Sequence, residues 1–281
     1  MKITFWGTRG SLPASGPETQ YYGGNTSCIT VSNDKHLLVL DAGSGIRRVG
    51  LSGIPFRYER IDILLTHLHM DHIQGLGFFA PLYQPGAEVH VWGPASYNSD
   101  LPSRLTRYLS PPLFPVRIRE LPSNIEFHEV GCQEFEIGDF HITSRYVCHP
   151  GPTVGYRITH GKSVFTYIPD HEPALGDDNF PISEEWTSGF DLAKGADILV
   201  HDAQFSNEEY QARVGWGHST FEHALAFAKI CEVKRLLLFH HDPSHTDRDL
   251  ERFYSEYVGS NHRAFEVRLS RENDTFLLSG D

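Results

Sequence analysis

The chain has 281 residues with a hydrophobic content of 40%, and its 24 basic and 36 acidic residues give a net charge of −12. This composition predicts a globular protein, and the acidic balance makes broad capture of long nucleic acid unfavourable because phosphate backbones are repelled. The four cysteines are far apart and no run of 18 apolar residues occurs, so we expect a cytoplasmic protein with reduced thiols and no membrane span.

Short strands separated by glycines are predicted for the first 45 residues, at 2–7, 26–32 and 35–45. A buried strand over 60–67 places His67 at its C-terminal end, and a short helix is predicted from Asp71. Another strand covers 87–94, and a helical stretch that starts at 96 breaks at Pro111 and Pro112 into a proline-rich loop that ends at 116.

The middle of the chain, 125–170, is rich in strands, and "THGKS" reads as a hairpin turn. The last third alternates strands (196–202, 233–242) with helices (221–231, 247–258). No linker or composition break is visible, so we predict one domain over 1–281. Two sets of helices around mixed strands predict an α/β (α+β) fold, with two mixed sheets between helices in a four-layer αββα sandwich.

One short stretch concentrates metal donors. Residues 66–75 read "THLHMDHIQG", which places His67, His69, Asp71 and His72 within six positions. On a loop that leaves a strand, His67 and His69 can converge on one metal ion, while Asp71 and His72 turn toward a second. The alternative is a polar surface loop with scattered histidines.

Further donors follow buried strands elsewhere in the chain. His149 comes before a Gly/Pro turn, Asp170 follows an aromatic strand, and the neighbours His240 and His241 follow another strand. Donors at strand ends are how a rigid scaffold positions a site. The sequence therefore predicts a dinuclear centre.

The order HxHxDH, His, Asp, His resembles the metallo-β-lactamase fold superfamily of metallohydrolases, and more narrowly its tRNase Z and phosphodiesterase branch. The resemblance extends over nearly the whole chain, through "GTRGS", "HPGPTVGYRI", "IPDHE", "HDAQF", "GHST" and "FHHDP". It implies two divalent ions, first of all zinc, with manganese or iron as alternatives.

The resemblance also implies the ligands. One ion takes His67, His69 and His149; the other takes Asp71, His72 and a histidine of the last motif, and Asp170 bridges the two. The spacing before the proline favours His240, which leaves His241 to support the site or contact the substrate. We expect His171 to be structural.

We predict His218, Asp71 and Asp202 as the residues that take part in catalysis. The resemblance makes His218 of "GWGHST" the general acid, or a donor to a phosphoryl oxygen. The alternative for His218 is a residue that merely precedes a helix capped by Ser219 or Thr220. Asp202 stands where the family has a glutamate, and its expected role is to orient His218. Asp41 either supports a ligand or caps a turn.

The predicted function is hydrolysis of a small phosphodiester, such as a cyclic nucleotide, by a hydroxide that bridges the two metals. A tRNA-processing nuclease fits less well, since only 20 residues separate His149 from Asp170 and leave no room for the long arm of those enzymes. The alternatives are a lactone, thioester or β-lactam hydrolase and a non-catalytic binding protein. Arg9 is a candidate phosphate contact, and 108–116 either covers the site, forms a contact in a homodimer or packs as an ordinary loop.

Overall fold

Strand β3 (Leu37–Leu40) shows how the layers form, because its side chains alternate between two apolar clusters. Leu38 and Leu40 point into a core between two sheets, whereas Leu37 and Val39 pack under a layer of helices. A strand buried on both faces reads as a continuous apolar run, which is what the sequence shows here. The computed structural model describes residues 1–177, 180–181, 183–184, 186–259 and 264–279.

Within these residues, the first sheet has seven strands in the order β14-β1-β2-β3-β4-β5-β6. Strands β3 to β6 are parallel to one another, whereas β14, β1, β2 and β3 pair antiparallel. Besides β3, its strands are β1 (Lys2–Gly7), β2 (Cys28–Ser32), β4 (Arg60–Leu64), β5 (Glu88–Pro94), β6 (Asn124–Val130) and β14 (Thr275–Leu277).

The second sheet, over the same described residues, has the order β13-β12-β11-β10-β9-β8-β7. Strands β10 to β13 are parallel, and β7 to β10 pair antiparallel. Its strands are β7 (Gln133–Ile137), β8 (Phe140–Tyr146), β9 (Val154–His160), β10 (Ser163–Ile168), β11 (Ile198–Asp202), β12 (Arg235–Phe239) and β13 (Glu266–Leu269). The predicted hairpin turn is the connection between β9 and β10.

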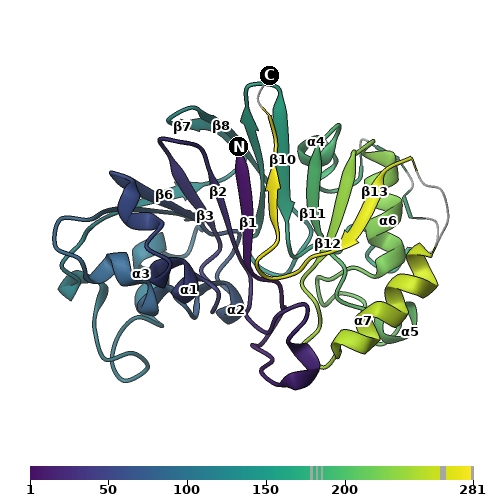
Figure 1. Ribbon diagram of the computed structural model, residues 1–281, viewed down its shortest axis with the longest axis horizontal. Coiled ribbons are helices and arrows are strands. Elements are labelled where there is room, and N and C mark those ends of the chain that lie inside the picture. Colours follow the sequence, from purple (N-terminus) through teal and green to yellow (C-terminus); the bar gives the residue numbers. More distant parts are fainter. Residues whose placement is uncertain (178–179, 182, 185, 260–263, 280–281) are drawn as a thin grey trace.

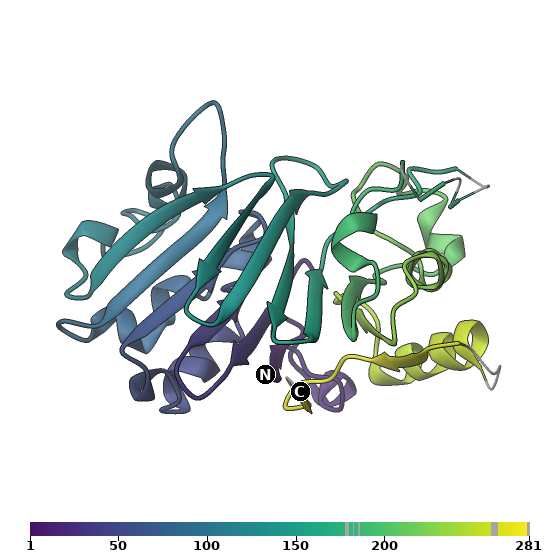
Figure 2. The same cartoon turned by 90° about the horizontal axis from the view of Figure 1, so that it is seen from above.

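Helices cover the outer face of each sheet, so that the four-layer sandwich is confirmed (Figures 1 and 2). On the first sheet lie α1 (Ile46–Leu51), α2 (Met70–Ile73) and α3 (Leu101–Thr106), with 3-10 turns η2 (Pro55–Arg57), η3 (Leu76–Phe78), η4 (Ala80–Tyr83) and η5 (Ile118–Glu120). On the second lie α4 (Phe190–Ala193), α5 (Asn207–Tyr210), α6 (Phe221–Ile230) and α7 (Asp247–Phe253), which continues as the π-helical turn η6 (Tyr254–Val258). The 3-10 turn η1 (Pro17–Thr19) follows β1.

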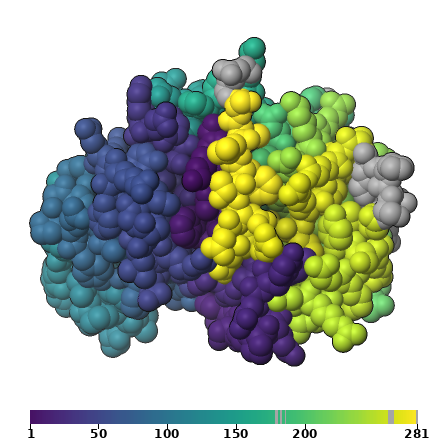
Figure 3. All heavy atoms as spheres, viewed as in Figure 1, coloured from purple at the N-terminus to yellow at the C-terminus, as the bar shows by residue number. Residues whose placement is uncertain are grey.

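The two ends of the chain close the first sheet. Strand β14 pairs antiparallel with β1, with Lys2 opposite Leu277, and the C-terminal segment lies along the N-terminal strand in Figure 3. Among the described residues, no helix is both long and apolar enough to cross a bilayer. That the chain is a single domain over 1–281 stays a prediction.

Candidate metal centre

The N-terminal half supplies its donors from one connection. Strand β4 ends at Leu64, and His67 and His69 follow on the loop. The short helix α2 then begins, with Asp71 and His72 in its single turn. Parallel strands end at the same edge of a sheet, so this loop lies at the carboxyl edge of the first sheet, where ligands bind in open α/β sheets.

The C-terminal half supplies three donors from three separate strand ends. His149 comes after β8, Asp170 after β10 and His240 directly after β12. His240 has a φ of 60°, a left-handed backbone conformation that reverses the chain as it leaves β12. All seven predicted donors therefore converge between the carboxyl edges of the two sheets.

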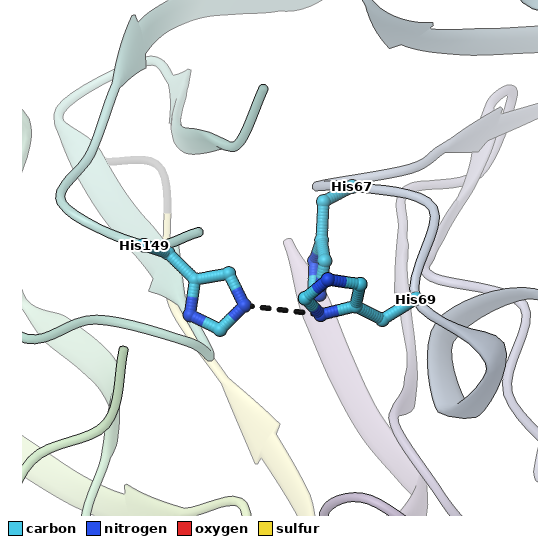
Figure 4. A group of neighbouring side chains, drawn as sticks. All are labelled: His67, His69 and His149. Carbon is cyan, nitrogen blue, oxygen red and sulfur yellow. Dashed lines mark hydrogen bonds between the residues drawn. The ribbon is translucent and has the colours of Figure 1, made fainter. Parts of the chain in front are cut away.

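The seven donors form the two predicted groups. The first contains His67, His69 and His149, and the second contains Asp71, His72, Asp170 and His240; within each group the donor atoms lie within 4.8 Å of one another. In Figure 4, His149 points across from its own strand end toward His67 and His69, with 3.1 Å between His149 Nε2 and His69 Nδ1.

Asp170 lies between the two groups. One carboxylate oxygen is 3.0 Å from His72 Nε2. The other oxygen is 3.3 Å from His240 Nε2, 3.6 Å from His67 Nε2 and 3.8 Å from His149 Nε2. One oxygen therefore faces the second group alone, while the other lies between imidazoles of both groups, as expected of a bridging ligand.

Asp41 fixes two of the imidazoles. It accepts a hydrogen bond from His72 Nδ1 at 2.7 Å, from the Thr66 amide at 2.7 Å and from the Tyr167 hydroxyl at 2.9 Å. The Thr66 hydroxyl donates to the same carboxylate and so is left to accept from His67 Nδ1 at 3.1 Å. Both imidazoles thereby hold a proton on Nδ1 and turn an Nε2 lone pair into the cluster. Of the two roles open for Asp41, the structure shows ligand support.

Two other imidazoles are oriented in the same way. His240 Nδ1 donates to Gln204 Oε1 at 2.9 Å, and His149 Nδ1 donates to the Gly217 carbonyl at 2.7 Å. Such outer partners raise the basicity of a ligand and hold its ring in place.

The electrostatics of the cluster suit cations. Burial lowers the pKa of His67 far below its ordinary value and that of His149 to about 4, so both imidazoles are neutral at pH 7. Burial disfavours the charge of Asp170, but His240 and His72 outweigh it and keep its pKa well below the usual range. Burial opposes a charge on His72, but Asp170, Asp71 and Asp41 outweigh it and raise its pKa, so this position attracts positive charge. Imidazoles around two carboxylates are the ligand set that divalent transition metals prefer.

Two buried polar atoms of the cluster test this fit. Among the described residues, neither His67 Nε2 nor Asp170 Oδ1 has a hydrogen-bond partner. An unpartnered buried polar atom costs about 1–3 kcal/mol unless an ion or water satisfies it. The residues present therefore fit two divalent cations.

His218 lies beside the second group, with its ring stacked on that of His240 at 4.9 Å between centroids. Its Nδ1 donates to Asp202 Oδ2 at 2.7 Å, so Asp202 contacts His218 as predicted. Burial opposes a charge on His218, but Asp202 outweighs it and raises the pKa to about 9. Helix α6 starts after His218 and is capped by Thr220.

Glu172, two residues after Asp170, was not predicted to serve the site. It is buried and accepts from the amides of Gly215 at 2.8 Å and Gly217 at 2.6 Å and from the Tyr210 hydroxyl at 2.8 Å. A Cβ at Gly217 would lie 2.4 Å from His149 Nδ1, and its φ is 91°, so only glycine fits there. Glu172 thus clamps the loop that orients His149 and carries His218.

One sequence-based expectation changes. Arg9 is fully buried and is not available to a phosphate. Its guanidinium donates to the carbonyls of Gly23, Asp242 and His245, and so it links the first turn to the loop after β12. The turn instead serves Asp71, which accepts from the Ser11 amide at 2.7 Å.

The remaining candidates lie away from the donors. His241 is buried and donates from Nε2 to the Ser270 carbonyl, and His171 pairs with the core residue His201 at 2.9 Å. Within 108–116, Leu109 and Phe114 are buried under the helices of the first sheet, so this segment packs as an ordinary loop there.

A small pocket opens beside the first group. It has a volume of about 170 Å³ and is lined by His67, Leu68, His69, Ser96, Arg104, Pro150, Gly151 and Pro152. His69 is exposed, whereas His67 is buried, so the pocket reaches the cluster from the His69 side.

Comparison with known proteins decides the family. A family model described as Beta-lactamase superfamily domain matches residues 36–241, which include all seven donors. The chain belongs to this superfamily. The predicted family and fold are thereby confirmed.

Among similar proteins, ribonuclease Z of Thermosynechococcus vestitus is 27% identical over 282 residues, which cover 85% of this chain and 66% of that protein. The crystal structure of human tRNase Z, short form, aligns with a TM-score of 0.68 at 21% identity over 99% of this chain and 100% of that one. A diphosphatase from the PhnP family aligns with a TM-score of 0.67 at 18% identity over 98% and 96%. The names of these relatives agree with the predicted hydrolase class.

Proposed function

We propose that this member of the superfamily is a dinuclear metal-dependent phosphodiesterase that acts on a small phosphodiester, with zinc as the first choice of metal. The observation that carries the proposal is the His218–Asp202 pair beside the donor cluster. Hydrolysis of a phosphodiester needs a proton for the departing alkoxide, and a carboxylate-paired imidazole can hold it.

The donors divide between the two cations as the groups indicate. His67, His69 and His149 would hold one cation, Asp71, His72 and His240 the other, and Asp170 both. Bound there, two divalent cations supply a water of lowered pKa and neutralise charge on the phosphoryl oxygens.

The chain's own residues do the rest. Asp202 holds the Nδ1 proton of His218, which leaves Nε2 as the atom that passes a proton to the leaving oxygen. Asp41, Gln204 and the Gly217 carbonyl keep the ligand imidazoles in one tautomer, so their lone pairs need no rearrangement during turnover.

The size and charge of the pocket beside His69 favour a small anionic substrate. Its 170 Å³ lies below the range of about 300–1,000 Å³ typical of pockets for drug-sized ligands. The Arg104 guanidinium in its wall adds positive charge, although it also contacts Glu129 at 3.0 Å. A second candidate, RNA 3′ processing, is favoured by the ribonuclease Z relatives, while the short segment between His149 and Asp170 favours the small substrate.

The test is a substrate screen of the metal-loaded protein with bis(p-nitrophenyl) phosphate, cyclic nucleotides, a precursor tRNA, a lactone and nitrocefin. We expect turnover of the small phosphodiesters. Activity confined to the lactone or nitrocefin would overturn the proposal, and activity confined to precursor tRNA would establish the second candidate. A metal-free chain that takes up no zinc on titration would exclude both.

The role of His218 has a sharper test. p-Nitrophenolate leaves without a proton, whereas an alkoxide needs one. We therefore expect His218→Asn to lower kcat about 100-fold or more on a phosphodiester with an alkyl leaving group and far less on the p-nitrophenyl ester, at unchanged metal content. Equal losses on both esters would contradict a general-acid role.

A further inference from the structure

A second set of metal donors lies on the first sheet, apart from the seven donors of the candidate centre. His90 of β5 and Glu126 and His128 of β6 have donor atoms within 4.8 Å of one another. The two strands are parallel, with His90 opposite Glu126 and Trp92 opposite His128. Side chains two residues apart on a strand share a face, so all four side chains project from the same face of the sheet.

The imidazole nitrogens face each other. His90 Nδ1 is 2.8 Å from His128 Nε2, and the two rings are parallel within 6°. The Glu126 carboxylate oxygens are 3.6 Å from His90 Nδ1 and 3.7 Å from His128 Nε2. In a tetrahedral zinc site with bonds of about 2.0–2.1 Å, ligand atoms lie about 3.3 Å apart. Each of these distances is within about half an ångström of that value.

Aromatic stacking holds the donors in place before any ion binds. Trp92 stacks on His128 with ring centroids 3.9 Å apart. Phe135 of β7 stacks on Trp92 in turn, with ring centroids 4.7 Å apart. The Trp92 indole N–H donates to Asp62 at 2.8 Å, and Arg60 pairs with the same carboxylate. A ligand whose ring is fixed by its neighbours loses little entropy on binding a metal.

The site is open to solvent on one side only. The side chain of Glu126 is 64% exposed, whereas those of His90 and His128 are 12% and 23% exposed. An ion can thus enter from the Glu126 side and meet two imidazoles and a carboxylate, a set that suits Zn²⁺, Ni²⁺ and Cu²⁺ rather than Mg²⁺ or Ca²⁺.

We propose that His90, Glu126 and His128 form a separate binding site for a late first-row divalent ion such as Zn²⁺, which cross-links strands β5 and β6. The inference does not depend on the proposed catalytic activity, because it shares no residue with the catalytic centre.

The test counts zinc by equilibrium dialysis of the full chain against buffered zinc. The native chain is expected to bind one equivalent more than the variant His90→Asn/His128→Asn, whatever number the catalytic centre holds. The matched control is His141→Asn: His141 is also a strand histidine beside a glutamate, 3.6 Å from Glu134, and its loss should leave the count unchanged. Glu126→Gln removes one ligand without touching the stacked rings and should weaken the extra zinc at least about tenfold.

A second readout locates the ion. With the catalytic centre filled by zinc, added Ni²⁺ should quench the fluorescence of the native chain and of Trp216→Phe, but much less that of Trp92→Phe.

Equal zinc counts in the native chain and the double variant, both with native circular dichroism, would overturn the proposal. So would loss of the extra zinc in His141→Asn. If the double variant misfolds, unchanged zinc affinity in Glu126→Gln decides against the site. Phosphodiester turnover of the Glu126→Gln variant should equal that of the native chain, so failure of this site and failure of the proposed catalysis are separately visible.

Discussion

The two halves of the molecule build the candidate centre in different ways. The N-terminal half contributes four donors from a single connection of six residues after β4, whereas the C-terminal half contributes three donors that are 21 to 91 positions apart, at the ends of β8, β10 and β12. The donors after β4, β10 and β12 follow strands that lie in parallel pairs, whereas His149 follows β8, which pairs antiparallel with its neighbours. The contiguous donors depend on local backbone, while the dispersed donors depend on the register of the second sheet and on the packing of the two sheets.

The largest effect should come from the dispersed half. Asp170→Asn removes the carboxylate that lies within 3.0–3.8 Å of four imidazoles, two in each group. We expect loss of both metals and a fall of about 1,000-fold in kcat/KM, which corresponds to about 4 kcal/mol of transition-state stabilisation. The measurements are metal content and phosphodiester turnover. As a comparison from the N-terminal half, His69→Ala removes an exposed donor of the first group only and should lose one metal equivalent. If Asp170→Asn kept its full metal content, the expected difference between the two halves would be wrong.

The next comparison uses one carboxylate from each half, each 2.7 Å from an imidazole: Asp41 with His72 and Asp202 with His218. Asp41→Asn should weaken metal binding about 10- to 100-fold, because it removes the acceptor that orients a ligand. Asn is suited to the φ of 58° at this position, which limits backbone strain.

Asp202→Asn should leave the metal affinity unchanged and lower kcat by about 10- to 100-fold, because it weakens the orientation and protonation of His218. Zinc titration and steady-state kinetics on an alkyl phosphodiester separate the two outcomes. If both variants lost metal to the same extent, His218 would have to be counted as part of the ligand set.

The smallest effect should come from changing Glu172, which holds the loop at 215–217. Glu172→Gln keeps the size of the side chain but replaces one acceptor oxygen with an NH₂ group that faces a backbone N–H, so we expect kcat to fall about tenfold while KM and metal content stay near native values. Tyr210→Phe removes a single donor to the same carboxylate and should cost less. A Glu172→Gln variant with native kcat would show that the loop at 215–217 holds its position without the clamp.

Most of the centre could be predicted from the sequence, but for different reasons in the two halves. His67 to His72 form a motif that local spacing makes visible. His149, Asp170 and His240 were found because a donor follows a buried apolar strand in each case, and the structure brings them together. The choice of His240 over His241 agrees with the geometry, since His240 Nε2 faces Asp71 and Asp170 whereas His241 donates to the Ser270 carbonyl.

The supporting residues were harder to predict. Gln204 lies 36 positions before His240, the imidazole that it supports. Tyr167 lies 95 positions after His72, with which it shares Asp41 as a hydrogen-bond acceptor. A single sequence carries no signal for such pairs. Arg9 looked available to a phosphate because it stands in a glycine-rich turn, but tertiary packing buries it. For Glu172 a signal existed, since a second carboxylate two residues after a bridging aspartate is an unusual charge to bury.

The tripeptide Asp170–His171–Glu172 has a consequence for engineering. It joins the residue between the two donor groups to the clamp on the His218 loop, and Ser219 also donates to the His171 carbonyl at 2.6 Å. Any redesign that lengthens this segment would shift His218 and Asp170 together. Altered substrate preference is therefore better sought in Ser96, Arg104 and residues 150–152, which line the pocket from other elements and can be varied as a library while the reactive groups keep their spacing.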